Sequence, residues 1–141
     1  MPRIVALDVG DKTIGVAASD ELMIAAHPVR TIRRTRSVKA DLKEVEDLLD
    51  EIKASVVVIG MPLTAEGDMG PQAEKVKDFR DRLARRLRIT VETCDERYST
   101  ADAQDRLLEA DVSRAKRRRV IDQAAAVVIL EDYLREHVRD H

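Results

Sequence analysis

Residues 4–15, with the sequence IVALDVGDKTIG, decide how the chain begins to fold. A short apolar run ends here in a carboxylate, Asp8, and Gly10 follows two positions later. An apolar run bounded by a glycine-containing turn is typical of a buried β-strand. Residues 13–19 (TIGVAAS) predict a second strand, and the connection between the two is short enough for a hairpin turn. We therefore expect a β-hairpin that carries an aspartate where its first strand leaves the core.

The composition favours one ordinary domain that spans residues 1–141. Hydrophobic residues make up 44% of the chain, which is enough for a single core. Charged residues make up 37%, but their net charge is only −2, so the chain lacks the global positive charge of a polyanion binder. A local basic groove stays compatible with this balance. Aromatic residues make up only 2%, which argues against base stacking as the main mode of nucleic-acid binding.

The single cysteine, Cys94, excludes an internal disulfide and is typical of a reducing compartment. It lies in an apolar stretch, where a small core residue is a better interpretation than a reactive thiol. The sequence contains neither a secretion signal pattern nor an apolar run of membrane-spanning length. We therefore expect a soluble cytoplasmic protein that does not bind membranes.

A third strand is predicted over residues 23–32. Pro28 favours a position at the edge of a sheet, because proline cannot donate a hydrogen bond to a neighbouring strand. Several positive charges lie in and just after this strand, with Asp41 as one nearby acid. They fit a solvated surface and a patch that contacts a nucleic-acid backbone equally well. These cations are Arg30, Arg33, Arg34, Arg36, Lys39 and Lys43.

Helices and strands alternate in the middle of the chain. Apolar residues at three- and four-residue intervals predict amphipathic helices over residues 38–53 and 71–87. The segment between them at 55–60, SVVVIG, is uniformly apolar, as in a central strand covered on both faces, and its place after a helix predicts a parallel crossover. The glycine- and proline-rich loop at 60–71 is long for a simple connection, which favours a functional role.

The next strand, residues 89–94, ends just before a second acidic residue, Glu96. Ser99 and Asp102 have the spacing of a capping box, so a helix is expected to begin there. Glu96 is therefore predicted to lie in a strand-to-helix turn, much as Asp8 lies at the end of its own strand.

The last helix is predicted from Val120 to about Val138, after the basic run RAKRRR at 114–119. Helical spacing places Asp122 on the same face as Ala125 and Ala126, and small residues there would let the helix approach the sheet closely. Taken alone, Asp122 is better explained as a surface residue or as a favourable charge near the helix N-terminus.

The three carboxylates together favour another interpretation. Asp8 and Glu96 end two strands, and Asp122 lies on a helix able to pack over both. Three neighbouring acids repel one another unless one is protonated or cations neutralise them. Oxygen ligands without His or Cys suit Mg²⁺ or Mn²⁺, and such ions beside basic patches indicate phosphodiester hydrolysis.

Four segments resemble, in order, the signatures of the YqgF/RuvX family. They are DVGDKTIGVAASD at 8–20, VVIGMPL at 57–63 with the glycine-rich loop after it, DERYST at 95–100 and IDQAAAVVILEDYL at 121–134. Each motif alone is weak, but four in order at the proper spacing are specific. The resemblance extends from Ile4 to about Leu134, which is nearly the whole chain.

The resemblance implies an RNase H-like α/β fold, with a five-stranded mixed sheet whose first three strands are antiparallel and which is flanked by helices. It also implies that Asp8, Glu96 and Asp122 are the metal-binding catalytic acids, the same three that the sequence pattern selects. Members of the family are described as pre-16S rRNA nucleases or Holliday-junction-resolvase-like proteins. The chain departs from many members at Thr13, where they have arginine, and in an unusual loop sequence at 64–66.

The leading hypothesis is a nuclease that uses two Mg²⁺ or Mn²⁺ ions to cut an rRNA precursor, or branched or single-stranded DNA or RNA. A DNA junction would favour a homodimer, because two symmetric strands are cut, whereas an rRNA precursor is compatible with a monomer. The residues expected to contact nucleic acid are Lys12, Thr13, Arg97, Lys116, Arg117, Arg118 and Arg119.

Two other classes of protein share parts of this pattern. A nucleic-acid-binding factor with little catalysis is the alternative, although such a protein could afford to lose the acidic triad, which is intact here. An ATPase of the actin and sugar-kinase type also opens with a strand, an aspartate and a glycine turn. It needs two lobes around a cleft, and 141 residues supply only one.

Overall fold

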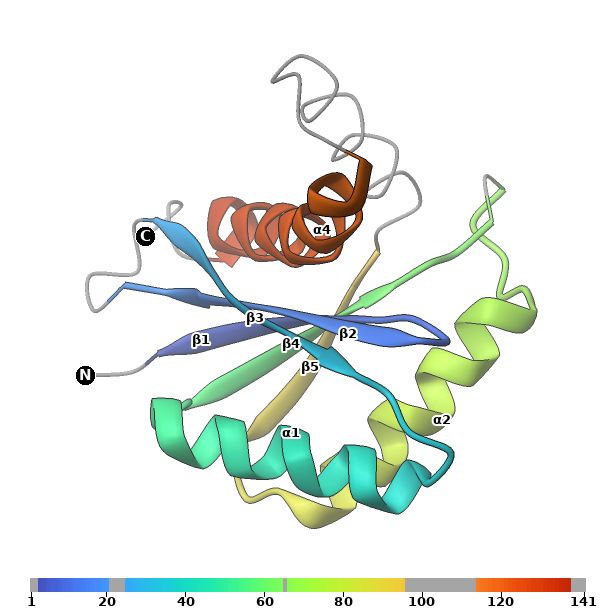
Figure 1. Cartoon of the computed structure of the whole chain (residues 1–141), viewed down its shortest axis with the longest axis horizontal. Helices are drawn as coiled ribbons and strands as arrows, with labels where there is room; N and C mark the ends of the chain where they lie inside the picture. The colour runs from blue at the N-terminus through green and yellow to red at the C-terminus, as the bar shows by residue number, and fades with distance from the viewer. Residues whose placement is uncertain (1–2, 21–24, 65, 96–113, 138–141) are drawn as a thin grey trace.

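The computed structural model describes residues 3–20, 25–64, 66–95 and 114–137, with the backbone alone for residues 114–123 and 137. Its elements follow one another along the chain as Figure 1 shows. They are β1 (Ile4–Val9), β2 (Thr13–Ser19), β3 (Ala26–Arg33), α1 (Val38–Ile52), β4 (Val56–Met61), α2 (Pro71–Arg86), β5 (Thr90–Asp95) and α4 (Arg114–His137).

The strands form one five-stranded sheet with the order β3-β2-β1-β4-β5. Strand β2 runs antiparallel to both β1 and β3, whereas β4 runs parallel to both β1 and β5. The predicted mixed sheet with three antiparallel strands first is therefore confirmed. Strand β3 lies at the edge, as Pro28 predicted, and Pro28 pairs with Ala17 where the register between β2 and β3 shifts.

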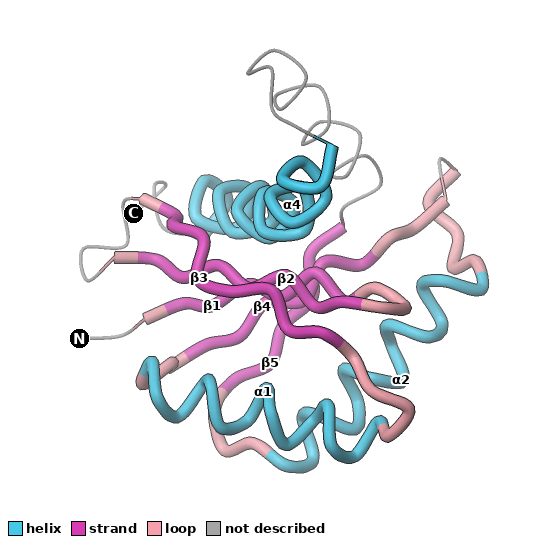
Figure 2. The backbone as a smooth tube through the Cα atoms, in the orientation of Figure 1, coloured by secondary structure: helices cyan, strands magenta, loops and turns pink. Residues whose placement is uncertain are grey.

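The helices cover the sheet on both faces, as the tube in Figure 2 shows most clearly. Of the described helices, α1 and α2 lie on one face and α4 lies on the other. Strand β1 serves both layers because its side chains alternate. Val5, Leu7 and Val9 join the core under α1 and α2, whereas Ile4 and Ala6 join the core under α4.

The ends of α1 follow ordinary capping chemistry. The Ser37 hydroxyl accepts a hydrogen bond of 3.1 Å from the backbone N–H of Ala40, and Lys53 closes the helix in the left-handed conformation with φ 63°. Helix α2 begins at Pro71, whose fixed φ suits the first helical position. The predicted bounds of both helices agree with the structure to within one residue.

Three predictions for the chain need comment. Helix α4 begins at Arg114 rather than at Val120, so the basic run at 114–119 belongs to the helix, because arginine, lysine and alanine are strong helix formers. Strand β3 starts at Ala26, later than expected, since Ala25 is already irregular. Glu96 and the helix expected from Ser99 lie outside the described residues. Among the helices that the structure describes, none is long and apolar enough to cross a membrane.

Candidate active site

Asp8 lies near the end of β1, the central strand of the sheet. By alternation its side chain follows Ile4 and Ala6 onto the α4 face, where it is half-buried. Strand β1 pairs with the parallel strand β4 up to Leu7, so Asp8 is the next residue beyond the parallel ladder. This is the carboxyl end of a parallel pair, the edge of open α/β sheets at which ligands commonly bind.

A row of residues crosses the sheet beside Asp8. Asp8 pairs with Gly15 of β2, and Gly15 pairs with Thr31 of β3. Gly15 carries no side chain, so two polar side chains flank a bare backbone position in this row. The Thr31 hydroxyl is buried and forms no hydrogen bond within the part of the chain that the structure describes. A buried polar atom without a partner is uncommon in folded proteins.

Strand β5 and helix α4 meet on the same face of the sheet. The hydroxyl of Tyr133, on α4, donates a hydrogen bond to the Glu92 carboxylate of β5, and Cys94 packs in the core beneath the helix. The prediction of Cys94 as a small core residue is confirmed. Burial and the bond to Glu92 raise the pKa of Tyr133 to about 12, so the phenol stays protonated at neutral pH.

Helix α4 reaches the sheet through small side chains. Ala125 and Ala126 are buried to within 1% exposure, and Ile129 packs one turn further along. Asp122 belongs to the same helix, one turn before these alanines, but its side chain lies outside the described part. The structure therefore brings the helix of Asp122 onto the face that carries Asp8, as the sequence predicted.

The predicted nucleic-acid contacts are described only in part. Lys12 is exposed in the β1–β2 turn, and Thr13 begins β2 directly opposite Arg33 of β3. Arg97 and the side chains of residues 116–119 lie outside the described residues, as does Glu96. Of the acidic triad, only the Asp8 side chain is therefore placed. Within the described ranges, no three His, Cys, Asp or Glu side chains come together as a metal site would require.

Arg34 joins three elements next to the turn that follows Asp8. Its backbone N–H donates to the Lys12 carbonyl at 2.8 Å, and its Nη1 donates to the Gly10 carbonyl at 2.9 Å. Its Nε lies 3.1 Å from Oδ2 of Asp41, in α1, and its guanidinium lies 5.1 Å from the ring centre of Phe79, in α2. Arg34 thereby holds the β1–β2 turn against both helices.

Asp41 is the buried partner of this arginine, with no exposed surface. Burial alone would raise its pKa. Hydrogen bonds from the Thr35 N–H at 2.9 Å, from Arg34 and from the Thr35 hydroxyl outweigh burial and lower the pKa below its ordinary value. The sequence placed Arg34 in a run of apparently equivalent cations, and no local pattern in that run separates it from Arg33 or Arg36.

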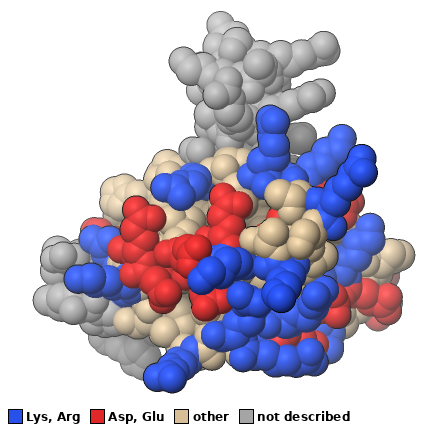
Figure 3. Space-filling model, turned by 60° about the horizontal axis from the view of Figure 1, so that its bottom comes forward, with Lys and Arg blue, Asp and Glu red and all other residues tan. Residues whose placement is uncertain are grey.

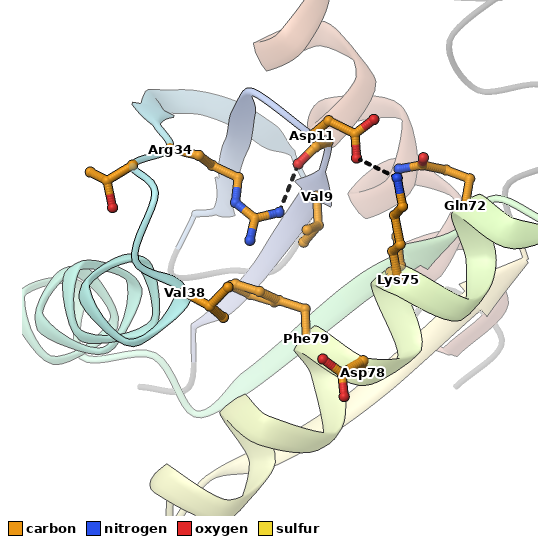
Figure 4. A pocket seen from close by; sticks show the side chains of 11 residues that line it. Val9, Asp11, Arg34, Val38, Gln72, Lys75, Asp78 and Phe79 are labelled. Carbon is orange, nitrogen blue, oxygen red and sulfur yellow. Dashed lines mark hydrogen bonds and ion pairs between the residues drawn. The ribbon is translucent and has the colours of Figure 1, made fainter.

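A pocket of about 310 Å³ lies beside Arg34, on the α1 and α2 side of the sheet (Figure 4). Val9, Val38 and Phe79 give it an apolar wall, and an ion pair of 3.5 Å between Lys75 and Asp11 spans its rim. Asp8 is not part of this pocket, since its side chain follows the other face. The pocket was not predicted from the sequence, because its lining comes from three separate segments, 9–11, 34–38 and 72–79.

Comparison with known proteins identifies this architecture as an RNase H-like fold. Thermus thermophilus RuvC, solved in complex with a Holliday junction substrate, superposes with a TM-score of 0.62 over 98% of both chains at 14% sequence identity. A second structure of T. thermophilus RuvC superposes with a TM-score of 0.52 over 95% of both chains at 10% identity. At such low identity the likeness concerns the fold.

Sequence comparison is more specific. The model of the RuvX family, described as "Holliday junction resolvase", matches residues 2–136, and this chain belongs to that family. A Myxococcus xanthus protein named "Putative pre-16S rRNA nuclease" is 51% identical over 96% of this chain and 89% of its own length. A Clostridium tetani protein of the same name is 46% identical over 94% of this chain and 95% of its own length. These comparisons confirm the family recognised in the sequence and support a nuclease role.

Proposed function

We propose that this chain is a divalent-metal-dependent nuclease that hydrolyses phosphodiester bonds, most directly in processing the 5′ end of pre-16S rRNA. The observation that carries the proposal is the position of Asp8. A half-buried carboxylate ends the central strand, on the face that α4 covers and at the open end of the parallel ladder. The names of the relatives support the substrate, and the family description supports branched DNA as a second substrate.

The donor set fits Mg²⁺ or Mn²⁺. Asp8, Glu96 and Asp122 would hold the ions through carboxylate oxygens alone, which these hard cations prefer. When bound, the ions supply Lewis acidity for the attacking water and for the leaving oxygen. The chain's own residues bind and orient the substrate. Lys12 and Thr13, beside the Asp8 strand, would contact phosphate oxygens, as would Arg97 and the four cations at 116–119, positioning the backbone without reading its sequence.

The remaining expectations form part of the same proposal. Residues 1–141 would make one nuclease domain that works in the cytoplasm. It would act as a monomer on an rRNA precursor and as a homodimer on a four-way junction, because a junction presents two symmetry-related strands. The loop at 60–70 would shape the groove that receives the substrate.

The test is cleavage of labelled substrates by wild type, Asp8→Asn and Asp11→Asn, with Mg²⁺ and with Mn²⁺. The substrates are an RNA with the pre-16S 5′ precursor, single-stranded DNA and a four-way DNA junction. Asp8→Asn removes a ligand charge at nearly constant size, so cleavage should fall by orders of magnitude with an unchanged melting temperature. Asp11→Asn removes an exposed carboxylate three residues away and should keep wild-type cleavage.

The outcomes separate the two functional classes. Metal-dependent cleavage that is lost only in Asp8→Asn supports the nuclease, and the substrate cut fastest identifies its task. Equal traces of cleavage in all three proteins would indicate contamination. If all three also bound the nucleic acids equally well, the chain would be a binding factor with little catalysis.

A further inference from the structure

The run of cations around β3 and the start of α1 divides into two groups. Arg34 is paired with buried Asp41, and Nζ of Lys43 lies 3.0 Å from Oδ1 of Asp47. The rest of the run is exposed and forms no ion pair with a carboxylate in the described part of the chain. These exposed cations are Arg30, Arg33, Arg36 and Lys39.

Lys12 extends this second group toward the Asp8 strand. It precedes Thr13, which lies opposite Arg33, and its carbonyl accepts the N–H of Arg34 at 2.8 Å. Lys12 is exposed as well and is likewise without an ion pair among the described residues. We call the whole group the β3 strip, which consists of Lys12, Arg30, Arg33, Arg36 and Lys39.

Helix α2 carries a comparable number of cations, but most of these are neutralised locally. Nζ of Lys77 lies 2.9 Å from an Asp81 oxygen, and Nε of Arg86 lies 2.9 Å from a Glu46 oxygen of α1. Figure 3 shows the face that α1 and α2 cover, where basic side chains gather on the right with some acidic side chains among them, and other acidic side chains gather on the left. The α2 cations with a carboxylate partner are Lys75, Lys77, Arg80, Arg82 and Arg86.

The strip is electrostatically unfavourable in the free protein. Arg36 and Lys39 flank the N-terminus of α1, where the helix dipole is positive and disfavours cations. The acid in the first turn of α1 is Asp41, which is buried and already bonded to Arg34 and Thr35. A bound polyanion would reduce the electrostatic repulsion between these exposed like charges. A nucleic-acid backbone is the polyanion that suits an elongated strip of lysine and arginine.

The strip also lies where a nuclease would need it. Ile32 faces the α1 and α2 core, so Arg33 and its partner Thr13 face the α4 side, two residues along the strands from the Asp8 row. Arg30 lies three residues back along β3, about 10 Å away, and pairs with Val16 of the α1 and α2 core, so its side chain leaves the edge strand on that side. The strip therefore starts near the Asp8 row on the α4 face and crosses the edge strand β3 to the side of α1, where Arg30, Arg36 and Lys39 lie.

We propose that the β3 strip is a backbone-binding track that holds the nucleic acid flanking the bond presented to Asp8. The proposal rests on the nuclease function proposed above and extends it to Arg30, Arg33, Arg36 and Lys39. Contacts of this kind give affinity and register without base specificity. The exposed edge strand β3 then has a function in addition to closing the sheet.

The experiment measures binding against salt concentration by fluorescence anisotropy, in the cleavage-deficient Asp8→Asn background. The probes are a labelled four-way DNA junction and a labelled RNA with the pre-16S 5′ precursor. The strip variant combines Arg30→Gln, Arg33→Gln, Arg36→Gln and Lys39→Gln. The control variant combines Lys43→Gln, Lys77→Gln, Arg82→Gln and Arg86→Gln, which removes the same charge from cations that already have a carboxylate partner.

The strip variant should bind at least about 10-fold more weakly, and its slope of log K against log salt should be smaller by about 3, since each phosphate contact contributes about 0.7 to 0.9. The control should change the slope by less than about 1. With Asp8 intact, the strip substitutions should raise KM and leave kcat unchanged. Melting temperatures establish that both variants are folded.

If the slope of log K against log salt were the same for the strip and control variants, the proposal that the β3 strip binds the backbone would be overturned. The nuclease proposal would still stand. A wild-type chain that neither binds nor cuts either probe would overturn both proposals. Cleavage without any effect of the strip on KM would show that the substrate runs along another surface, and would also overturn the strip.

Discussion

The two faces of the sheet are built from the same strands but packed in different ways. Under α1 and α2 the core consists of large branched side chains, among them Leu7, Ile14 and Leu83, which are completely buried. Under α4 the core also contains large side chains such as Leu130, but the sheet and the helix additionally meet through the small residues Ala6, Ala17 and Ala126. Large side chains bury much apolar area and give stability, whereas small ones bring backbones together.

We infer from this difference that the two faces have different roles, one in stability and the other in the proposed site. The α1 and α2 face holds the fold together, and its polar groups are structural, as in the Arg34–Asp41 pair. The α4 face carries Asp8 at its open end, and its polar groups lie where a reacting phosphate would bind under the proposed function. Substitutions that act on one face and not on the other test the assignment.

The largest loss of stability is expected from Leu83→Ala, on the α1 and α2 face. Leu83 is fully buried on α2, so the substitution leaves a cavity and should lower the free energy of unfolding by about 4 kcal/mol. Cleavage per folded molecule should stay at the wild-type level. Urea denaturation and a cleavage assay corrected for the folded fraction measure the two quantities. A specific loss of cleavage would show that this face is coupled to the site.

Asp41→Asn should lower the free energy of unfolding by about 3 kcal/mol at neutral pH, because it leaves the guanidinium of Arg34 without its counter-charge. Since the pKa of Asp41 is lowered in the folded state, its contribution is complete above the unfolded value of about 3.9 and is lost as the pH falls through the folded pKa. The difference from wild type should therefore shrink below about pH 4. A constant difference down to acid pH would contradict this origin.

Ala126→Leu and Ala73→Leu form a matched pair on opposite faces. Both alanines are fully buried, on α4 and α2 respectively, so either substitution overpacks its core and should cost about 2 kcal/mol. Only Ala126→Leu should also reduce cleavage, because it displaces the helix that carries Asp122. Chemical denaturation and kcat of the two variants make the comparison. Equal kcat values would remove the distinction between the faces.

The smallest effect is expected from Tyr133→Phe, which removes the hydrogen bond to Glu92 and should cost about 1 kcal/mol. Because burial and this bond raise the pKa of Tyr133 to about 12, wild type should lose stability as the pH rises from about 10 to about 12. The phenylalanine variant has no phenol to ionise and should lack this part of the alkaline loss. If both proteins lost the same free energy of unfolding between about pH 10 and pH 12, the prediction would be contradicted.

The order and type of the secondary structure could be predicted because each signal is local. The apolar run before Asp8, the edge proline Pro28 and the period of α1 depend on neighbouring residues only. The start of α4 was predicted too late. The basic run at 114–119 was interpreted as a segment that precedes the helix, although its residues favour helix. The hairpin of the first two strands was predicted from the residues, whereas the antiparallel order of all three first strands came from the family resemblance.

The sequence by itself determined the family, the strands, and the candidate role of Asp8, because apolar periodicity and motif spacing are written along the chain. Only the tertiary structure decided which of the similar cations have partners. Arg34 enters the core beside Asp41 while Arg33 and Arg36 stay exposed, although all three lie within four residues. Strand alternation, the α1 terminus and Phe79 of α2 set that division together, and such a convergence of distant segments leaves no local pattern to recognise.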